Sequence, residues 1–184
     1  VLDLAHLAGD VRVSGGGGSE IKVEATKRVR HRDAAEGKRL LDALRVDINS
    51  FNNRVEVRTI YPRRIPGRGN SMSASVDYVI TVPADAAVTL KSVSGNIFVS
   101  NVRGEVRAEA VSGDVNIGGT PNVAIAKTVS GDVLARDIGT QTALVLSTVS
   151  GTVVATGLKV RALEAGSVSG DVRSSRSGAR SSSE

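Results

Sequence analysis

The chain has 184 residues, of which 40% are hydrophobic and 23% charged, and its formal net charge is +5. Cysteine is absent, which excludes disulfides, thiolate metal sites and cysteine nucleophiles, and only two His, two Tyr and two Phe are present. Wide ligand pockets usually have aromatic walls, so these counts argue against an enzyme and predict neither a cofactor nor a metal site.

The N-terminal segment combines a glycine corner with alternating apolar residues. Leu-Ala-Gly-Asp-Val-Arg-Val begins at Leu7, and a glycine-rich turn at residues 15–18 leads to a second alternating stretch at residues 21–25. Alternation with a period of two predicts strands with one buried face. We therefore predict that residues 1–26 form a first coil, with Gly9 and Asp10 at its corner. We expect His6, which precedes this corner, to be a surface turn residue.

Residues 27–75 depart from this pattern and predict an irregular insertion. Asp-Ala-Ala-Glu at residues 33–36 has the form of a capping box, and Leu40, Leu41 and Leu44 follow on roughly one face. We predict a short helix near residues 33–45 that covers an end or flank of the sheet. Strand patterns return at residues 46–48 and 55–57, and residues 62–75, rich in Pro, Gly, Arg and Ser, predict an exposed loop.

The positive charge is concentrated in this section. From Lys22 to Arg68 there are thirteen Lys or Arg against six Asp or Glu, whereas the chain from Asp85 onward is nearly neutral. One interpretation is an anion-binding surface that meets an acidic glycan or an anionic lipid, and the other is a solvated loop face. Specific nucleic-acid binding is not expected, because the section offers only Phe51 and Tyr61 for base stacking. The candidate anion-binding residues are Arg28, Arg30, Arg32, Arg63, Arg64 and Arg68.

An internal repeat organises the second half of the chain. Val-Ser-Gly begins at residues 93, 111, 129, 149 and 168, at intervals of 18, 18, 20 and 19 residues. Asn or Asp follows in four copies, and Thr152 follows in the copy that begins at residue 149. An Ile or Val comes next each time. Apolar residues alternate with polar ones on both sides of each copy, so each repeat contains two short strands.

A repeat this short can bury its apolar face only against its neighbours. We predict an all-β fold, a single-stranded β-solenoid (β-helix) that is right-handed, with about 18–20 residues and two short strands per coil. The regular coils would span residues 76–172 of one domain covering residues 1–184, and residues 173–184 would be a polar, disordered tail. Val would stack on Val inside, and the apolar residues Val102, Ile138 and Leu158 would close the far turns, a series that Thr120 interrupts.

The corner residues are predicted to be structural. Gly suits a turn with positive φ or a close backbone approach, and Asx side chains bond to nearby backbone in turns. The predicted corner residues are Gly9, Asp10, Gly95, Asn96, Gly113, Asp114, Gly131, Asp132, Gly151, Gly170 and Asp171.

Three other interpretations of the repeat remain open. Calcium needs six to eight oxygen ligands, and each turn here offers one carboxylate, which disfavours a calcium-binding roll. Asp114 and Asp132 would stack about 5 Å apart, near the separation in a retaining glycosidase, so a polysaccharide-acting β-helix enzyme is an alternative. The last predicted coil lacks a polar cap, so solenoids could also stack end to end into homo-oligomers.

The repeated Val-Ser-Gly-Asp-Val corners resemble those of a known family. Together with Ala-Gly-Asp-Val-Arg-Val near the N-terminus and Val-Asp-Tyr-Val-Ile-Thr-Val-Pro from residue 76, they resemble the bacterial putative-adhesin β-solenoids, also called toastrack domains. The resemblance implies an extracytoplasmic module, in the periplasm or on the cell surface and membrane-associated in some full-length proteins. It also implies a role in adhesion, scaffolding or envelope sensing, with an envelope glycan or protein as partner and no catalytic residues.

Overall fold

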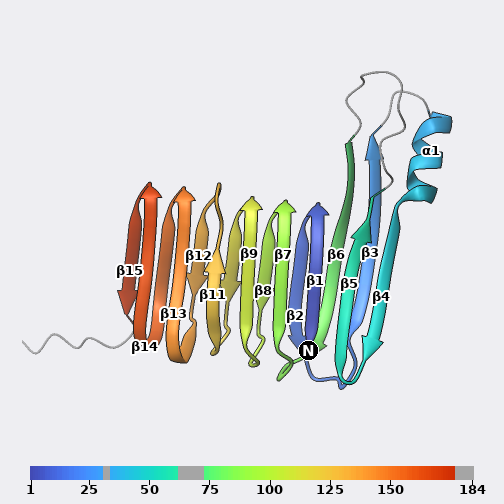
Figure 1. Cartoon of the computed structure of the whole chain (residues 1–184). Helices are drawn as coiled ribbons and strands as arrows, with labels where there is room; N and C mark the ends of the chain where they lie inside the picture. Colours follow the sequence, from blue (N-terminus) through green and yellow to red (C-terminus); the bar gives the residue numbers. More distant parts are fainter. Residues whose placement is uncertain (31–33, 62–72, 177–184) are drawn as a thin grey trace, which may run out of the picture.

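The structure is a computed structural model that describes residues 1–30, 34–61 and 73–176. In this part of the chain the strands stand side by side in two layers (Figure 1). The first layer has the order β4-β5-β1-β7-β9-β11-β13-β14, and the second has the order β3-β6-β2-β8-β10-β12-β14-β15. The strands of the first layer are β4 (Arg45–Phe51), β5 (Arg54–Ile60), β1 (Leu2–Ala8), β7 (Val88–Ser94), β9 (Val106–Ser112), β11 (Val123–Lys127) and β13 (Gly139–Ser150). Those of the second are β3 (Lys22–Arg30), β6 (Ser73–Pro83), β2 (Val11–Gly16), β8 (Ile97–Ser100), β10 (Val115–Gly118), β12 (Val133–Arg136) and β15 (Val172–Arg176), and β14 (Val153–Ser169) belongs to both.

Parallel pairing between successive coils confirms the predicted β-solenoid. Each coil contributes one strand to each layer, and equivalent residues lie side by side, as Ile97, Val115 and Val133 do in the second layer. These three side chains are fully buried between the layers, and the far turns close over the buried Val102 and Ile138. The thin core therefore consists mainly of Val, Ile, Leu and Ala, as the scarcity of aromatic residues indicated.

One predicted ladder lies on the opposite side of the sheet. The Val of the Val-Ser-Gly tripeptide points outward, and Val93, Val111 and Val129 are each 45–49% exposed. In β7 the inward positions are Val88, Leu90 and Ser92, so the strand period of two places Val93 outside. The ladder inside the solenoid is instead formed by the β-branched residues that follow the corners, which are buried at Ile97, Val115, Val133 and Val153, whereas Val172 on the last coil is 43% exposed.

The first coil in the sequence is not the first coil in space. β1 pairs with β5 on one side and β7 on the other, and β2 pairs with β6 and β8. The β1–β2 coil thus lies between the β5–β6 coil and the β7–β8 coil (Figure 1). The strand predicted at residues 21–25 belongs to β3, which pairs antiparallel with β6 rather than completing a coil.

The span of residues 27–75 is more regular than predicted. β4 and β5 form an antiparallel hairpin through Asn52 and Asn53, whose φ angles of 44° and 62° suit a two-residue turn. β5 and β6 then pair in parallel with the β1–β2 coil and so form a coil of their own. The predicted helix is α1 (Ala34–Ala43), which packs against β3; Leu40 is its buried leucine, and Leu44, directly after the helix, is also buried.

Two further differences concern local register and the C-terminal segment. A register shift in β11 buries Val123, whereas the alternation of the other repeats would bury Ala124. The segment predicted as a polar tail begins as strand β15, which pairs with β14, and its residues 177–184 lie outside the described part of the chain. The described residues contain no helix with the length and apolar character needed to cross a membrane.

Candidate functional site

The corner between the two layers requires glycine. Gly9, Gly95, Gly113, Gly131, Gly151 and Gly170 adopt φ angles between 122° and 147°. A Cβ atom at Gly131 would lie 2.3 Å from the carbonyl oxygen of Gly113 on the preceding coil, and one at Gly113 would lie 2.3 Å from that of Gly95. The coils therefore approach each other too closely at this corner for any side chain.

The Asx residues of the corner form a continuous ladder of hydrogen bonds. Each side-chain Oδ1 accepts the backbone N–H of the residue at the same position on the next coil. The bonds run from the N–H of Asp10 to Asp77 (3.0 Å), of Asn96 to Asp10 (3.0 Å), of Asp114 to Asn96 (2.9 Å), of Asp132 to Asp114 (2.8 Å) and of Thr152 to Asp132 (2.7 Å). Asn96 accepts as the aspartates do, so the ladder uses the acceptor oxygen and not the charge.

A second ladder lies just inside the corner and was not predicted. Thr128 and Thr148 each donate a 2.9 Å hydrogen bond to the glycine carbonyl of the preceding coil, at Gly113 and Gly131 respectively. Ser167 donates in the same way to Gly151. The signal in the sequence is a Ser or Thr directly before Val-Ser-Gly in four of the five copies.

A further row of turn residues lies at the far side of the coils. Asn101, Gly119, Asp137 and Gly157 have φ angles from 50° to 66°. Gly, Asn and Asp are the residues that enter this left-handed region most readily. Their spacing of 18, 18 and 20 residues matches the main repeat, and they could have been found by it.

The prediction that His6 is a surface residue is wrong. The ring is 5% exposed, its Nδ1 lies 3.2 Å from Thr59 Oγ1, and its Nε2 lies 3.2 Å from the carbonyl oxygen of Gly9. It also packs edge-on against the ring of Tyr78, whose hydroxyl is 2.6 Å from Thr59 Oγ1. Because β1 lies inside the stack, His6 is covered by Thr59 of β5 and Tyr78 of β6.

The hydrogen bonds around His6 define its protonation. The Gly9 carbonyl can only accept, so Nε2 carries a proton, and Nδ1 then accepts from the Thr59 hydroxyl, which accepts from Tyr78. Burial is the largest influence on this group and lowers the pKa of His6, which favours the neutral ring. Ser92, the equivalent residue on the next coil, is also buried, and its Oγ has no hydrogen-bond partner.

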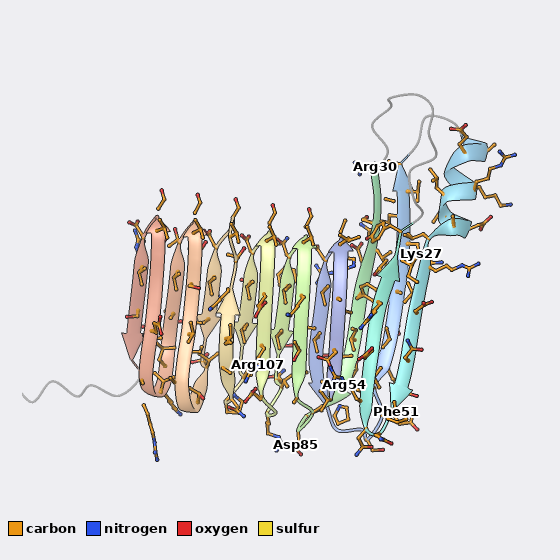
Figure 2. All side chains as sticks on the ribbon, viewed as in Figure 1. Lys27, Arg30, Phe51, Arg54, Asp85 and Arg107 are labelled. Atoms are coloured by element: carbon orange, nitrogen blue, oxygen red, sulfur yellow. The ribbon has the colours of Figure 1, made fainter. Side chains whose placement is uncertain are left out.

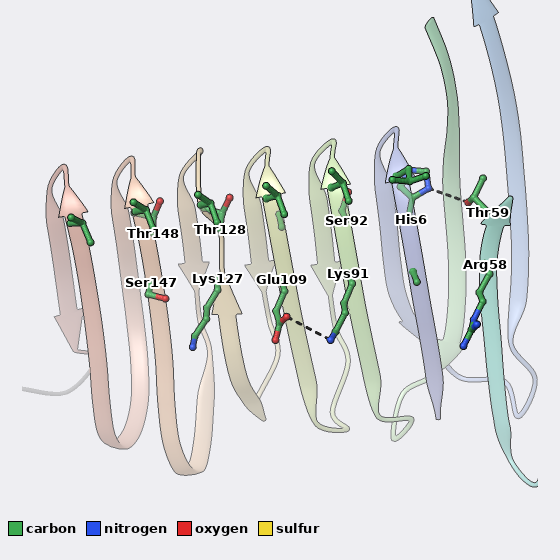
Figure 3. A pocket seen from close by; sticks show the side chains of 18 residues that line it. His6, Arg58, Thr59, Lys91, Ser92, Glu109, Lys127, Thr128, Ser147 and Thr148 are labelled. Atoms are coloured by element: carbon green, nitrogen blue, oxygen red, sulfur yellow. Dashed lines mark hydrogen bonds and ion pairs between the residues drawn. The ribbon is translucent and has the colours of Figure 1, made fainter. Parts of the chain in front are cut away.

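An open groove of about 970 Å³ crosses the outer face of the first layer (Figure 3). Two rows of outward side chains border it. The polar row contains Lys91, Glu109, Lys127 and Ser147, and Lys91 Nζ lies 3.9 Å from a carboxylate oxygen of Glu109. The apolar row, which we call the valine row, contains Leu7, Val93, Val111, Val129, Val149 and Val168. The sequence pattern contained both rows, but they were not singled out as a surface.

The predicted anion-binding surface is described only in part. Arg28 and Arg30 are exposed on β3, and Arg28 Nη2 lies 3.1 Å from Asp77 Oδ2. Lys27 and Arg30 lie at the end of the molecule that carries α1 (Figure 2). The other four predicted residues, Arg32, Arg63, Arg64 and Arg68, lie outside the described residues. In the part that is described, no three His, Asp or Glu side chains gather as a metal site would require.

A stack of parallel two-strand coils with laddered corners defines this protein as a β-solenoid. The chain belongs to the Toastrack DUF4097 family, whose model matches residues 2–183. Comparison with curated proteins finds no match. A crystal structure titled as a putative cell adhesion protein from Clostridium sporogenes ATCC 15579 is similar with a TM-score of 0.47 and 11% identity, over 95% of this chain and 92% of that chain.

Proposed function

We propose that the protein is a non-enzymatic module of the bacterial cell envelope or surface, which acts in adhesion, scaffolding or envelope sensing through its outer faces. Family membership supports this role. The main observation behind it is that the corner side chains are used to hold neighbouring coils together. Asp10, Asp114 and Asp132 each hold the backbone of the next coil, whereas the valine row and the polar row are left on the surface. The repeat thus builds a rigid support that displays an apolar row and a polar row on its outer face.

The ladder also weighs against a polysaccharide-acting enzyme. Glycoside hydrolysis uses one carboxyl group as an acid and a second as a nucleophile or base. Asp114 and Asp132 do lie on adjacent coils, but Oδ1 of each accepts a backbone N–H of the next coil at 2.8 Å and 2.7 Å. One oxygen of each carboxylate is therefore already used to hold the corner of the next coil.

Binding to isolated envelope components tests the proposal. The purified protein is incubated with peptidoglycan sacculi, with a glycan array and with vesicles of anionic and of zwitterionic lipid. We expect retention by at least one of these, reduced in a Lys91→Glu, Lys127→Glu variant of the groove and unchanged in Lys38→Glu on α1. Retention of wild type by none of the three would contradict a binding role. Hydrolysis of the glycans with product release would contradict a non-enzymatic one.

A further inference from the structure

We propose that the outer face of the first layer is a self-recognition surface, on which a second copy of this chain docks with its solenoid axis reversed. The first observation is the valine row itself. Its six side chains are 45–82% exposed and follow the stack from β1 to β14, five of them on strands and Val129 just beyond the end of β11. Strands are about 4.8 Å apart, so the row forms an apolar stripe about 24 Å long. Such an unbroken stripe marks an interaction site.

The polar row beside it indicates which partner fits. Its charges alternate along the stack as Lys91, Glu109 and Lys127. A uniformly charged row would favour a simple anion, whereas alternating charges favour a partner with the same alternation in reverse. A second copy of this face provides that pattern.

The centre of the valine row coincides with the boundary between opposite charges. A two-fold axis parallel to the strands, midway between β9 and β11, places Val111 over Val129 of the second copy. It also places Val93 over Val149 and Leu7 over Val168, so that the whole row is used. The same axis places Glu109 over Lys127 of the second copy and Lys127 over Glu109. Apolar and charged rows are therefore self-complementary about one axis, as an isologous dimer requires.

The acidic residues near the rims are compatible with this arrangement. Asp3 of one copy would approach Glu164 of the other, but Asp3 is already paired with Arg54, whose Nε lies 2.5 Å from Asp3 Oδ2. The face covers about seven residues along the strands and six strands across, or roughly 600 Å². This is below the ~800 Å² per partner of a standard interface, so we expect a dimer that forms at micromolar or higher concentration.

This inference deepens the proposed function by naming a partner of the same groove. It rests on that proposal only in treating the outer face as a binding surface. The two can fail separately, because self-association is measured in purified protein without envelope material.

Charge reversal with mixing provides the test, by sedimentation equilibrium up to about 1 mM protein. Glu109→Lys alone would place Lys against Lys127 in a homodimer, and Lys127→Glu alone would place Glu against Glu109. We expect each variant to weaken dimerisation at least tenfold. An equimolar mixture should restore it, because every pair in the mixed dimer joins opposite charges. Lys38→Glu, which changes a charge on α1, should leave dimerisation unchanged.

The apolar row is tested independently by Val111→Asp, with thermal unfolding confirming that the exposed substitution leaves the fold intact. It should weaken dimerisation at least tenfold. A wild-type protein that stays monomeric at the highest concentration would overturn the proposal. So would a dimer that Val111→Asp leaves unchanged, or single charge variants that fail to associate on mixing.

Discussion

The substitution Gly131→Ala tests the close packing of the corner. A Cβ at this position would lie 2.3 Å from the Gly113 carbonyl oxygen and 2.7 Å from its carbon, and Gly131 has a φ of 141°. An alanine in such a conformation costs about 1–3 kcal/mol in strain. Moving these two coils apart would also weaken the hydrogen bonds that join them, from the Gly113 N–H to the Ser130 carbonyl and from the Thr128 hydroxyl to the Gly113 carbonyl, about 1 kcal/mol each. We expect unfolding free energy to fall by about 3–5 kcal/mol.

Gly166→Ala is the matched control. Gly166 lies in the part of β14 that belongs to the first layer, and a Cβ there would meet no atom within 4 Å. Alanine at such a site should be neutral or stabilise the fold by up to about 1 kcal/mol, because it restricts the unfolded chain. Both variants are compared with wild type by urea unfolding followed by circular dichroism. A difference of less than about 0.5 kcal/mol between them would refute the steric account of the corner.

Three further predictions concern the polar groups near the corner. Asp132→Ala should cost about 1–2 kcal/mol in urea unfolding by leaving the Thr152 amide unpaired, while Asp132→Asn should stay within about 0.5 kcal/mol; equal losses would contradict the ladder. Thr148→Val should cost about 1 kcal/mol and Ser92→Ala nothing, since only Thr148 has a hydrogen-bond partner; a larger loss at Ser92 would contradict this assignment. Burial lowers the pKa of His6 from its usual 6.5, so the unfolded chain binds the proton first and stability should fall as pH drops below about 6.5. A His6→Gln variant should lose this part of the pH dependence, and an unchanged pH profile would contradict it.

The sequence was sufficient to predict the solenoid because the corner restricts residue type at each turn. Only glycine fits where the Gly113 and Gly131 backbones meet, so the restriction recurs from the β1–β2 coil to the last coil and the period is visible in one sequence. The inward and outward faces also follow from the strand period of two. The Val of Val-Ser-Gly has the opposite parity to the buried Leu90 and Ser92, so the same period indicates that it points outward.

The order of the coils could not be predicted in the same way. Coils with equivalent ladders can stack on one another without regard to their order along the chain, so nothing local in β1 indicates that it lies between β5 and β7. The burial of His6 depends on that order, since its partners Thr59 and Tyr78 come from β5 and β6. The groove likewise depends on side chains from five or more strands, which align only once the register between coils is known.

The central claim is that the repeated corners are structural and that the outer faces carry the function. The double variant Asp114→Asn, Asp132→Asn tests it most directly, because it removes both carboxylate charges while keeping both Oδ1 acceptors. Its retention by the envelope component that binds wild type is measured together with its thermal unfolding. The account predicts unchanged retention and an unfolding midpoint within a few degrees of wild type. Loss of retention in a variant that remains folded would contradict it.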